Sequence, residues 1–187
     1  MIRENETFKN IDYSQETPEA KEYENCRFMN CNFSFTDLSQ LSFEECSFED
    51  CDFSMTKLNN TAFREADFIN CKLSGLHFCD CNPFSLEFRF TNCILDFSSF
   101  YKLKLKKIPF NKCQLKETDF AEADLSGAVF HECDLNNAVF DRTNIEKADF
   151  RTAFNYRINP EINKIKKAKF SHSGLAGLLE QYNIEIS

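Results

Sequence analysis

The sequence predicts an all-β fold in which the chain coils as a square and parallel strands stack from one coil to the next. Three observations predict it: a large apolar residue at every fifth position, a small residue two positions before it, and repetition of the whole pattern at twenty. A spacing of five fits neither an α-helix nor an alternating strand. It fits a chain that turns through about a right angle every five residues, so that four units close one coil. Successive coils would stack at the strand spacing of about 4.8 Å.

The apolar positions, which we call centres, occupy most of the chain in two registers. All eleven centres from Phe28 to Phe78 are Phe or Leu, and so are twelve of the thirteen from Phe90 to Phe150. Fifteen of the 22 Phe residues are centres, so the unusual Phe content is explained by the core. At a spacing of twenty we expect one column of stacked Phe in each register. The registers differ by a slip of two residues near 79–90, which we expect to form a bulge at one corner.

Cysteine follows the same repeat. Nine of the ten cysteines, all except Cys79, follow this repeat: eight lie two residues before a centre, and Cys81 lies two before Pro83, where the first register would continue. In that position a thiol behaves as a small buried hydrophobe. The spacing of Cys26 and Cys31 differs from that of zinc ligands, and no histidine follows at ligand distance, so we expect no metal and no cofactor. Cys79 follows a centre, should be exposed, and is the one candidate for a reactive thiol.

The two ends of the chain depart from the repeat. The β-helix is expected over 1–155, with an irregular first coil over 1–25 because Pro18 takes a centre position. Residues 156–187 are expected to form a capping loop, one further unit and a short C-terminal helix and strand. Apolar residues at i, i+3, i+4 and i+7 predict an amphipathic helix with Ser173 as N-cap, ending at Asn183. A strand is expected over 184–186. The helix either caps the last coil or forms a dimer interface, and the residues alone leave both open.

The charges point to a surface rather than to a pocket. The chain carries a net charge of −8, which excludes a general nucleic-acid binder and favours a basic partner. Counting by twenties places Glu44 and Glu45 beside Glu24, with Glu65 over Glu45. The candidate partner-binding surface consists of Glu24, Glu44, Glu45, Glu49, Asp50 and Glu65, with Asp119, Asp124 and Asp134 from a second acidic region. Six lysines from Lys102 to Lys116, with no acid between them, form a basic band whose role stays open.

Catalysis and membrane insertion are not expected. The three histidines, His77, His131 and His172, lie far apart in the sequence, and no spacing suggests a nucleophile with its base. The inward positions are apolar or small, which leaves no room for a concave active site. No apolar run approaches the length of a signal peptide or a membrane span, so a cytoplasmic protein is expected.

The units at 123–127 (ADLSG) and 133–137 (CDLNN) resemble those of the pentapeptide-repeat family. That resemblance implies a right-handed quadrilateral parallel β-helix. Residues 158–165 and 174–182 resemble the C-terminal region of the branch that protects type II DNA topoisomerases, which includes quinolone-resistance and microcin-immunity proteins. The resemblance implies a DNA mimic that binds DNA gyrase or topoisomerase IV and does not itself bind nucleic acid. The alternative is a structural interaction solenoid with a different partner.

The same resemblance implies a homodimer joined through the C-terminus. The interface residues that it implies are Leu175, Leu178, Leu179, Tyr182, Ile184 and Ile186.

Overall fold

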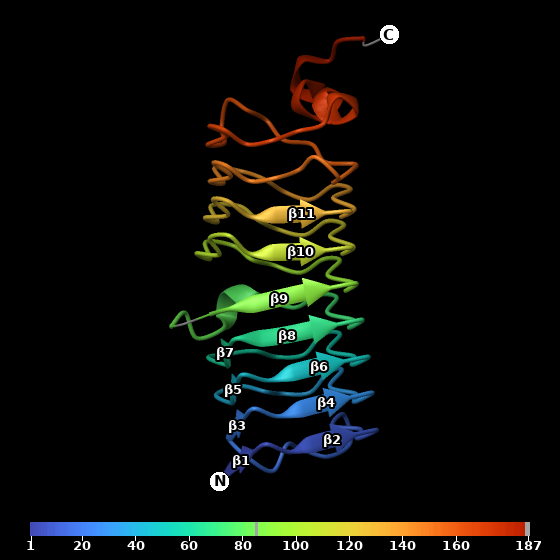
Figure 1. Ribbon diagram of the computed structural model, residues 1–187, viewed down its shortest axis with the longest axis vertical. Helices are drawn as coiled ribbons and strands as arrows, with labels where there is room; N and C mark the ends of the chain where they lie inside the picture. Colours follow the sequence, from blue (N-terminus) through green and yellow to red (C-terminus); the bar gives the residue numbers. More distant parts are fainter. Residues whose placement is uncertain (85, 186–187) are drawn as a thin grey trace.

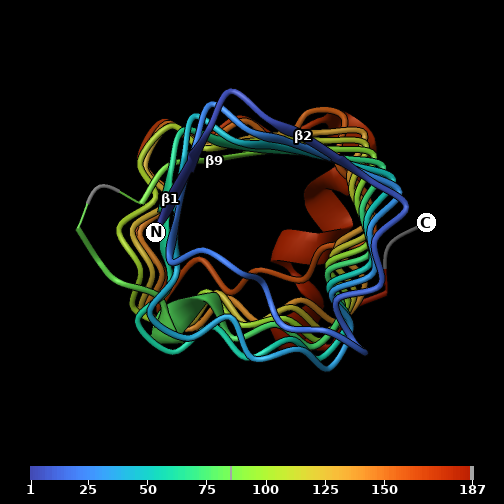
Figure 2. The same cartoon turned by 90° about the horizontal axis from the view of Figure 1, so that it is seen from below.

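The protein is an elongated stack of coils in a computed structural model that describes residues 1–84 and 86–185. The two termini lie at opposite ends of the stack (Figure 1), and the view along its axis shows four sides (Figure 2). We label the sides A to D in chain order; in one coil their buried centres are Phe43, Phe48, Phe53 and Leu58. The predicted all-β, quadrilateral β-helix is confirmed.

Parallel pairing at the predicted spacing of twenty builds sides A and B. Side A is a sheet of four strands: β1 (Ile2–Glu4), β3 (Glu22–Glu24), β5 (Ser42–Glu44) and β7 (Ala62–Arg64). Side B is a sheet of seven strands: β2 (Thr7–Lys9), β4 (Arg27–Met29), β6 (Ser47–Glu49), β8 (Ala66–Ile69), β9 (Phe88–Thr91), β10 (Pro109–Asn111) and β11 (Val129–His131). On sides C and D, successive coils are joined by isolated parallel bridges, such as that between Asp52 and Lys72 on side C.

Stacked aromatic rings fill the core. On side B the rings form one column from Phe8 to Phe170, with centroids 4.7 to 5.5 Å apart. Phe68 stacks on Phe90 at 5.4 Å, so this column continues across the register slip. The expectation of two separate columns was therefore wrong. Rings of adjacent sides meet edge to face, which is a favoured geometry for aromatic pairs.

The small position does more than avoid overfilling the core. The Thr56 hydroxyl donates a hydrogen bond to the carbonyl of Phe33, a centre of the coil before, at 2.7 Å. The Cys51 thiol donates to the Phe28 carbonyl in the same way at 3.4 Å. The Phe33 carbonyl also accepts from the Thr36 amide at 3.1 Å, so the hydroxyl is a second donor to an oxygen that has two lone pairs. Thr and Cys therefore suit this position as both small residues and hydrogen-bond donors.

The register slip is absorbed at the corner between sides D and A. A 3-10 helix, η1 (Phe78–Asp80), ends the straight part of side D. Cys81 is buried and the Asn82 amide still donates to the Thr61 carbonyl at 2.9 Å, after which the chain extends outward from side A (Figure 2). Phe88 is buried beside Phe90, with ring centroids 5.5 Å apart. The extra Phe fills the interior of the coil in which the chain swings outward.

The first coil is more regular than expected. β1 and β2 pair in register with β3 and β4, and Phe8 stacks on Phe28 at 4.8 Å. Among the described residues of this coil, parallel pairing stops after Asp12 and resumes at Glu22, so that one side has no bridge. The expectation of an irregular segment over 1–25 was too wide, because Pro18 disturbs one side rather than the coil.

The C-terminal segment contains two 3-10 helices, η2 (His172–Leu178) and η3 (Glu180–Tyr182), instead of the expected amphipathic helix. Its N-cap is Ser171, whose hydroxyl accepts a hydrogen bond from the Gly174 amide at 3.2 Å, and not Ser173. Asn183 ends the segment, as predicted, and its backbone is left-handed. Residues 184 and 185 are not in a strand, and Ile186 lies outside the described residues.

The cysteines give a chemical test of this core. Nine are buried, and Cys79 is half-buried rather than exposed as expected. Burial raises the pKa of the Cys79 thiol, and it raises that of Cys46 to about 12. A thiol reagent should therefore label Cys79 slowly, yet roughly tenfold ahead of the other nine. Mass spectrometry after brief exposure would measure this, and Cys79→Ser should remove the early label. Fast labelling of Cys46 in the folded protein would contradict the packing.

Candidate functional site

Exposed glutamates line the corner between sides A and B in the first coils. Parallel pairing stacks Glu4, Glu24 and Glu44 in one row. The Glu45 amide donates to the Arg64 carbonyl at 2.9 Å, which places Glu65 over Glu45 in a second row beside the first. We call Glu4, Glu24, Glu44, Glu45 and Glu65 the acidic edge; all five are exposed. Glu4 was missed from the sequence, although counting back by twenty from Glu24 reaches it.

Side A next to the acidic edge is hollowed. A shallow groove of about 330 Å³ has Ser42 and Ala62 among its lining residues, with Glu22 and Glu24 beside them. Arg64 occupies the next position of the first row, above Glu44. The two side chains form an ion pair, with Arg64 Nη1 and Glu44 Oε2 3.0 Å apart. Small residues in the groove and carboxylates beside it suit a protruding basic side chain of a partner.

Glu49 and Asp50, also predicted for the surface, lie beyond the acidic edge on side B and at its far corner. Asp50 accepts a hydrogen bond from the Asn70 amide at 3.1 Å, and Asn70 in turn accepts one from Asn92 at 2.9 Å. Asp50 therefore belongs to a ladder of side-chain amides along this corner. Asp50 is exposed and Glu49 is half-buried, and the part of both in the partner-binding surface stays a prediction.

The three predicted aspartates of the second acidic region do not form one surface. Asp119, Asp124 and Asp134 precede centres on sides D, A and C. Each accepts a hydrogen bond from the backbone amide two residues later, at 2.9, 3.1 and 3.2 Å. Such turns hold the corners of the coil, so these carboxylates have a local structural role. Because the three lie on different sides, they do not extend one surface, and their part in partner binding stays a prediction.

The basic band neutralises part of this second acidic region, including Asp124 and Asp134. Four of its lysines pair with acids of the following coil at 3.6 to 3.7 Å: Lys102 with Glu122, Lys106 with Asp124, Lys112 with Glu132, and Lys116 with Asp134. Exposed pairs of this kind add little stability, but they cancel charge locally. In the acidic edge, by contrast, Glu44 pairs with Arg64, and the other four glutamates form no ion pair within the described residues.

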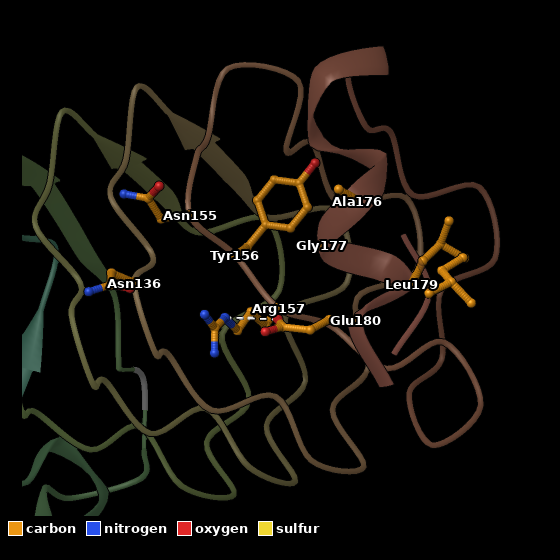
Figure 3. Close-up of a pocket in the computed structure, with 9 residues that line it drawn as sticks. Asn136, Asn155, Tyr156, Arg157, Ala176, Gly177, Leu179 and Glu180 are labelled. Carbon is orange, nitrogen blue, oxygen red and sulfur yellow. Dashed lines mark ion pairs between the residues drawn. The ribbon is translucent and has the colours of Figure 1, made fainter. Parts of the chain in front are cut away.

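The C-terminal segment is seated on the last coil through two glycines. A Cβ atom on Gly174 would collide with the Tyr156 hydroxyl, and one on Gly177 with the Tyr156 backbone carbonyl. The Ile158 amide donates to the Gly177 carbonyl at 2.9 Å. A pocket of about 360 Å³ remains between the segment and the coil, where Arg157 Nε and Glu180 Oε2 form an ion pair at 2.8 Å (Figure 3).

The predicted dimer residues are divided between two environments. Leu178 is half-buried and packs against the core, and Leu179 is half-buried beside the pocket. Leu175, Tyr182 and Ile184 are exposed. The segment therefore caps the last coil and also leaves an apolar surface open at the end of the rod.

The family follows from a match over most of the chain. The family model described as the pentapeptide repeat region matches residues 21–89 and 87–153. This chain belongs to the pentapeptide-repeat family. No curated protein sequence matches it significantly.

Two solved structures of trypsin-treated forms of QnrB1, described as a plasmid-mediated fluoroquinolone resistance protein, are similar in fold to this pentapeptide-repeat protein. One is 20% identical with a TM-score of 0.51 over 100% of both chains. The other is 22% identical with a TM-score of 0.50 over 99% of both chains.

Within residues 1–84 and 86–185, no group of three or more His, Cys, Asp or Glu side chains is arranged to hold a metal ion. His77, His131 and His172 lie on different parts of the rod. Across the same residues, the structure contains no helix with the length and hydropathy needed to cross a bilayer.

Proposed function

We propose that this protein is a non-catalytic ligand of a type II topoisomerase, DNA gyrase or topoisomerase IV. It occupies the DNA-binding surface of the enzyme in place of DNA and protects the enzyme from quinolones or from a peptide toxin. The observation that carries this proposal is the acidic edge, a run of exposed carboxylates on a rigid rod. The fold similarity to QnrB1, a fluoroquinolone resistance protein, supports it.

Charge spacing makes the substitution for DNA physically reasonable. Glutamates of successive coils recur at the strand spacing of about 4.8 Å, which is wider than the spacing of about 3.4 Å between charges along one strand of DNA but forms a regular row of the same sign. A protein surface built to bind phosphates carries Lys and Arg, which the carboxylates can pair with in the same way. Because the glutamates are fixed to a β-helix, binding orders only their side chains and costs little entropy.

The open apolar surface at the end of the rod supports a homodimer joined through the C-termini. Leu175, Tyr182 and Ile184 would be covered in such a dimer, and two rods end to end would present two acidic edges. We place this function in the cytoplasm, where a bacterial topoisomerase meets its DNA.

A second candidate is an interaction solenoid for a different basic protein. It is favoured by the restriction of the acidic edge to the first coils. In the later coils, side chains of opposite charge pair with one another, such as Lys112 with Glu132. A surface of paired charges does not resemble DNA. The two candidates share the binding surface and differ in the partner.

A supercoiling assay with purified gyrase and ciprofloxacin separates them. Micromolar amounts of the intact protein should restore supercoiling that the drug has blocked. Absence of both binding and any change in supercoiling would reject the topoisomerase and leave the second candidate.

A further inference from the structure

Three large apolar side chains lie exposed in one column at the corner between sides C and D. They are Phe35, Met55 and Phe97, which are 76%, 56% and 61% exposed. Each occupies the second position after a centre, where the turn requires a left-handed backbone, with φ of 58°, 59° and 61°. Elsewhere this turn position carries polar or charged residues or glycine among the described coils.

The three side chains form one continuous ridge. The amides of Phe35, Met55, Gly75 and Phe97 donate in turn to carbonyls of the next coil, each at 2.9 to 3.0 Å, so they belong to four successive coils. Gly75 lies between Met55 and Phe97 and has no side chain to contribute. The Met55 sulfur covers it, 2.5 Å from where a Cβ of Gly75 would lie. We call Phe35, Met55, Gly75 and Phe97 the apolar ridge.

Folding does not account for this ridge. A bulky residue in the left-handed region is strained, whereas Asn adopts it readily and fills the same position at Asn30, Asn60 and Asn70. Phe and Met also expose apolar area to water here without contributing to the core. Contiguous exposed apolar surface on a soluble protein commonly marks an interaction site.

We infer that the apolar ridge is an interface with a second copy of this chain, packed side by side and antiparallel about a two-fold axis. This inference does not depend on the proposed function, because the ridge lies at the corner diagonally opposite the acidic edge. The two surfaces can therefore be occupied at the same time.

The order of residues along the ridge is self-complementary. A two-fold axis between the coils of Met55 and Gly75 places Phe35 opposite Phe97 of the second copy. The same axis places Met55 opposite Gly75 of the second copy, where each Met55 already lies over its own glycine, so the two Met55 side chains meet across the axis. A two-fold interface uses one patch twice, and a central pair of Met side chains flanked by two Phe–Phe contacts satisfies that symmetry.

Charges beside the ridge favour the same arrangement. On side C, Asp52 and Lys72 pair at 3.6 Å in successive coils. The antiparallel axis brings Asp52 opposite Lys72 of the second copy, which completes a square of alternating charges. A parallel arrangement would instead set Glu117, the next residue of the corner column, against its own copy.

The size of the ridge predicts a weak dimer. At 150 to 250 Å² for a fully exposed aromatic side chain, the three residues present on the order of 400 Å² per copy. A standard specific interface buries about 800 Å² per partner. We therefore expect association at high micromolar to millimolar concentration, with fast exchange.

Analytical ultracentrifugation of the full chain tests this. Every protein in this experiment carries Leu175→Glu. This change adds a charge to the exposed apolar surface at the C-terminal end, so that association through the ridge is measured separately from association through that end. This parent should show a concentration-dependent dimer up to millimolar concentration. Adding Phe35→Asn, Met55→Asn and Phe97→Asn should weaken association by at least about tenfold without lowering the melting temperature, because Asn suits this turn. Phe84→Asn, at an exposed Phe outside the ridge, is the matched control and should change nothing.

A charge exchange tests the antiparallel orientation. Asp52→Lys alone should weaken the dimer, because it sets a lysine opposite Lys72 of the second copy. Adding Lys72→Asp should restore the dimer, because opposite charges again face each other across the axis. A parent that stays monomeric at millimolar concentration, or an Asn variant that associates as tightly as the parent, would overturn the inference. Failure of the double exchange to restore association would overturn the orientation.

Discussion

Replacing Phe130 by aspartate should unfold much of the solenoid. Phe130 is fully buried, and its ring stacks between Phe110 at 5.1 Å and Phe150 at 4.7 Å. Truncating a buried Phe costs about 3–5 kcal/mol, and an unpaired carboxylate in the same place adds several more. The total approaches the roughly 5–15 kcal/mol that stabilises a typical domain. Urea denaturation followed by circular dichroism would measure the loss.

Phe130→Leu is the matched control for this change. Leu is a natural centre at Leu115 and Leu125, both fully buried, so the side chain keeps its apolar contacts and loses only part of the ring stack. We expect a cost of about 1–2 kcal/mol. A wild-type unfolding curve for Phe130→Asp would show that the stacked column is not what holds the coils together.

Reversing Glu44, Glu45 and Glu65 to lysine should weaken binding to DNA gyrase by at least about a hundredfold. The three carboxylates are exposed and form the part of the acidic edge nearest Arg64. Each reversal replaces an attraction to a cationic partner by a repulsion, and the number of ions released on binding falls. The affinity should therefore also become less dependent on salt. Fluorescence anisotropy at several salt concentrations would measure both effects.

The matching control reverses charge on the same side at a distance from the acidic edge. Lys104→Glu with Lys107→Glu changes side A in a later coil and should leave binding unchanged or strengthen it. All of these variants should melt as the wild type does, since the positions are exposed. Equal loss of affinity in both sets would indicate a general charge effect and not a defined acidic edge.

The spacing of apolar residues was sufficient to predict the fold because one physical rule repeats along the chain. Each centre must point inward, so its position in the sequence determines its position in the coil. The rule fails where two centres compete, as at Phe88 and Phe90, which are both buried in one coil. No periodic count indicates which way the intervening chain swings outward.

The acidic edge was predictable in part. Counting by twenties found Glu24, Glu44, Glu45 and Glu65, because outward positions stack as regularly as inward ones. It did not find that lysines neutralise part of the second acidic region. Lys116 pairs with Asp134, eighteen residues later, because side-chain reach rather than coil register determines this contact.

The C-terminal segment shows a different limit. Its apolar spacing is that of an α-helix, yet Gly174 and Gly177 both face Tyr156. Residues three apart lie directly above one another in a 3-10 helix, so the tighter helix brings both glycines onto the aromatic residue. Docking on the coil therefore overrides the local pattern.

Displacement of DNA is the most direct test of the proposed mimicry. Gyrase would be loaded with a fluorescent linear duplex, and the intact protein titrated into the complex while anisotropy is recorded. If the protein occupies the DNA-binding surface, micromolar protein should release the duplex completely. The variant that carries Glu44→Lys, Glu45→Lys and Glu65→Lys should release it poorly. A stable complex of gyrase, duplex and protein, or an unchanged signal, would contradict the account.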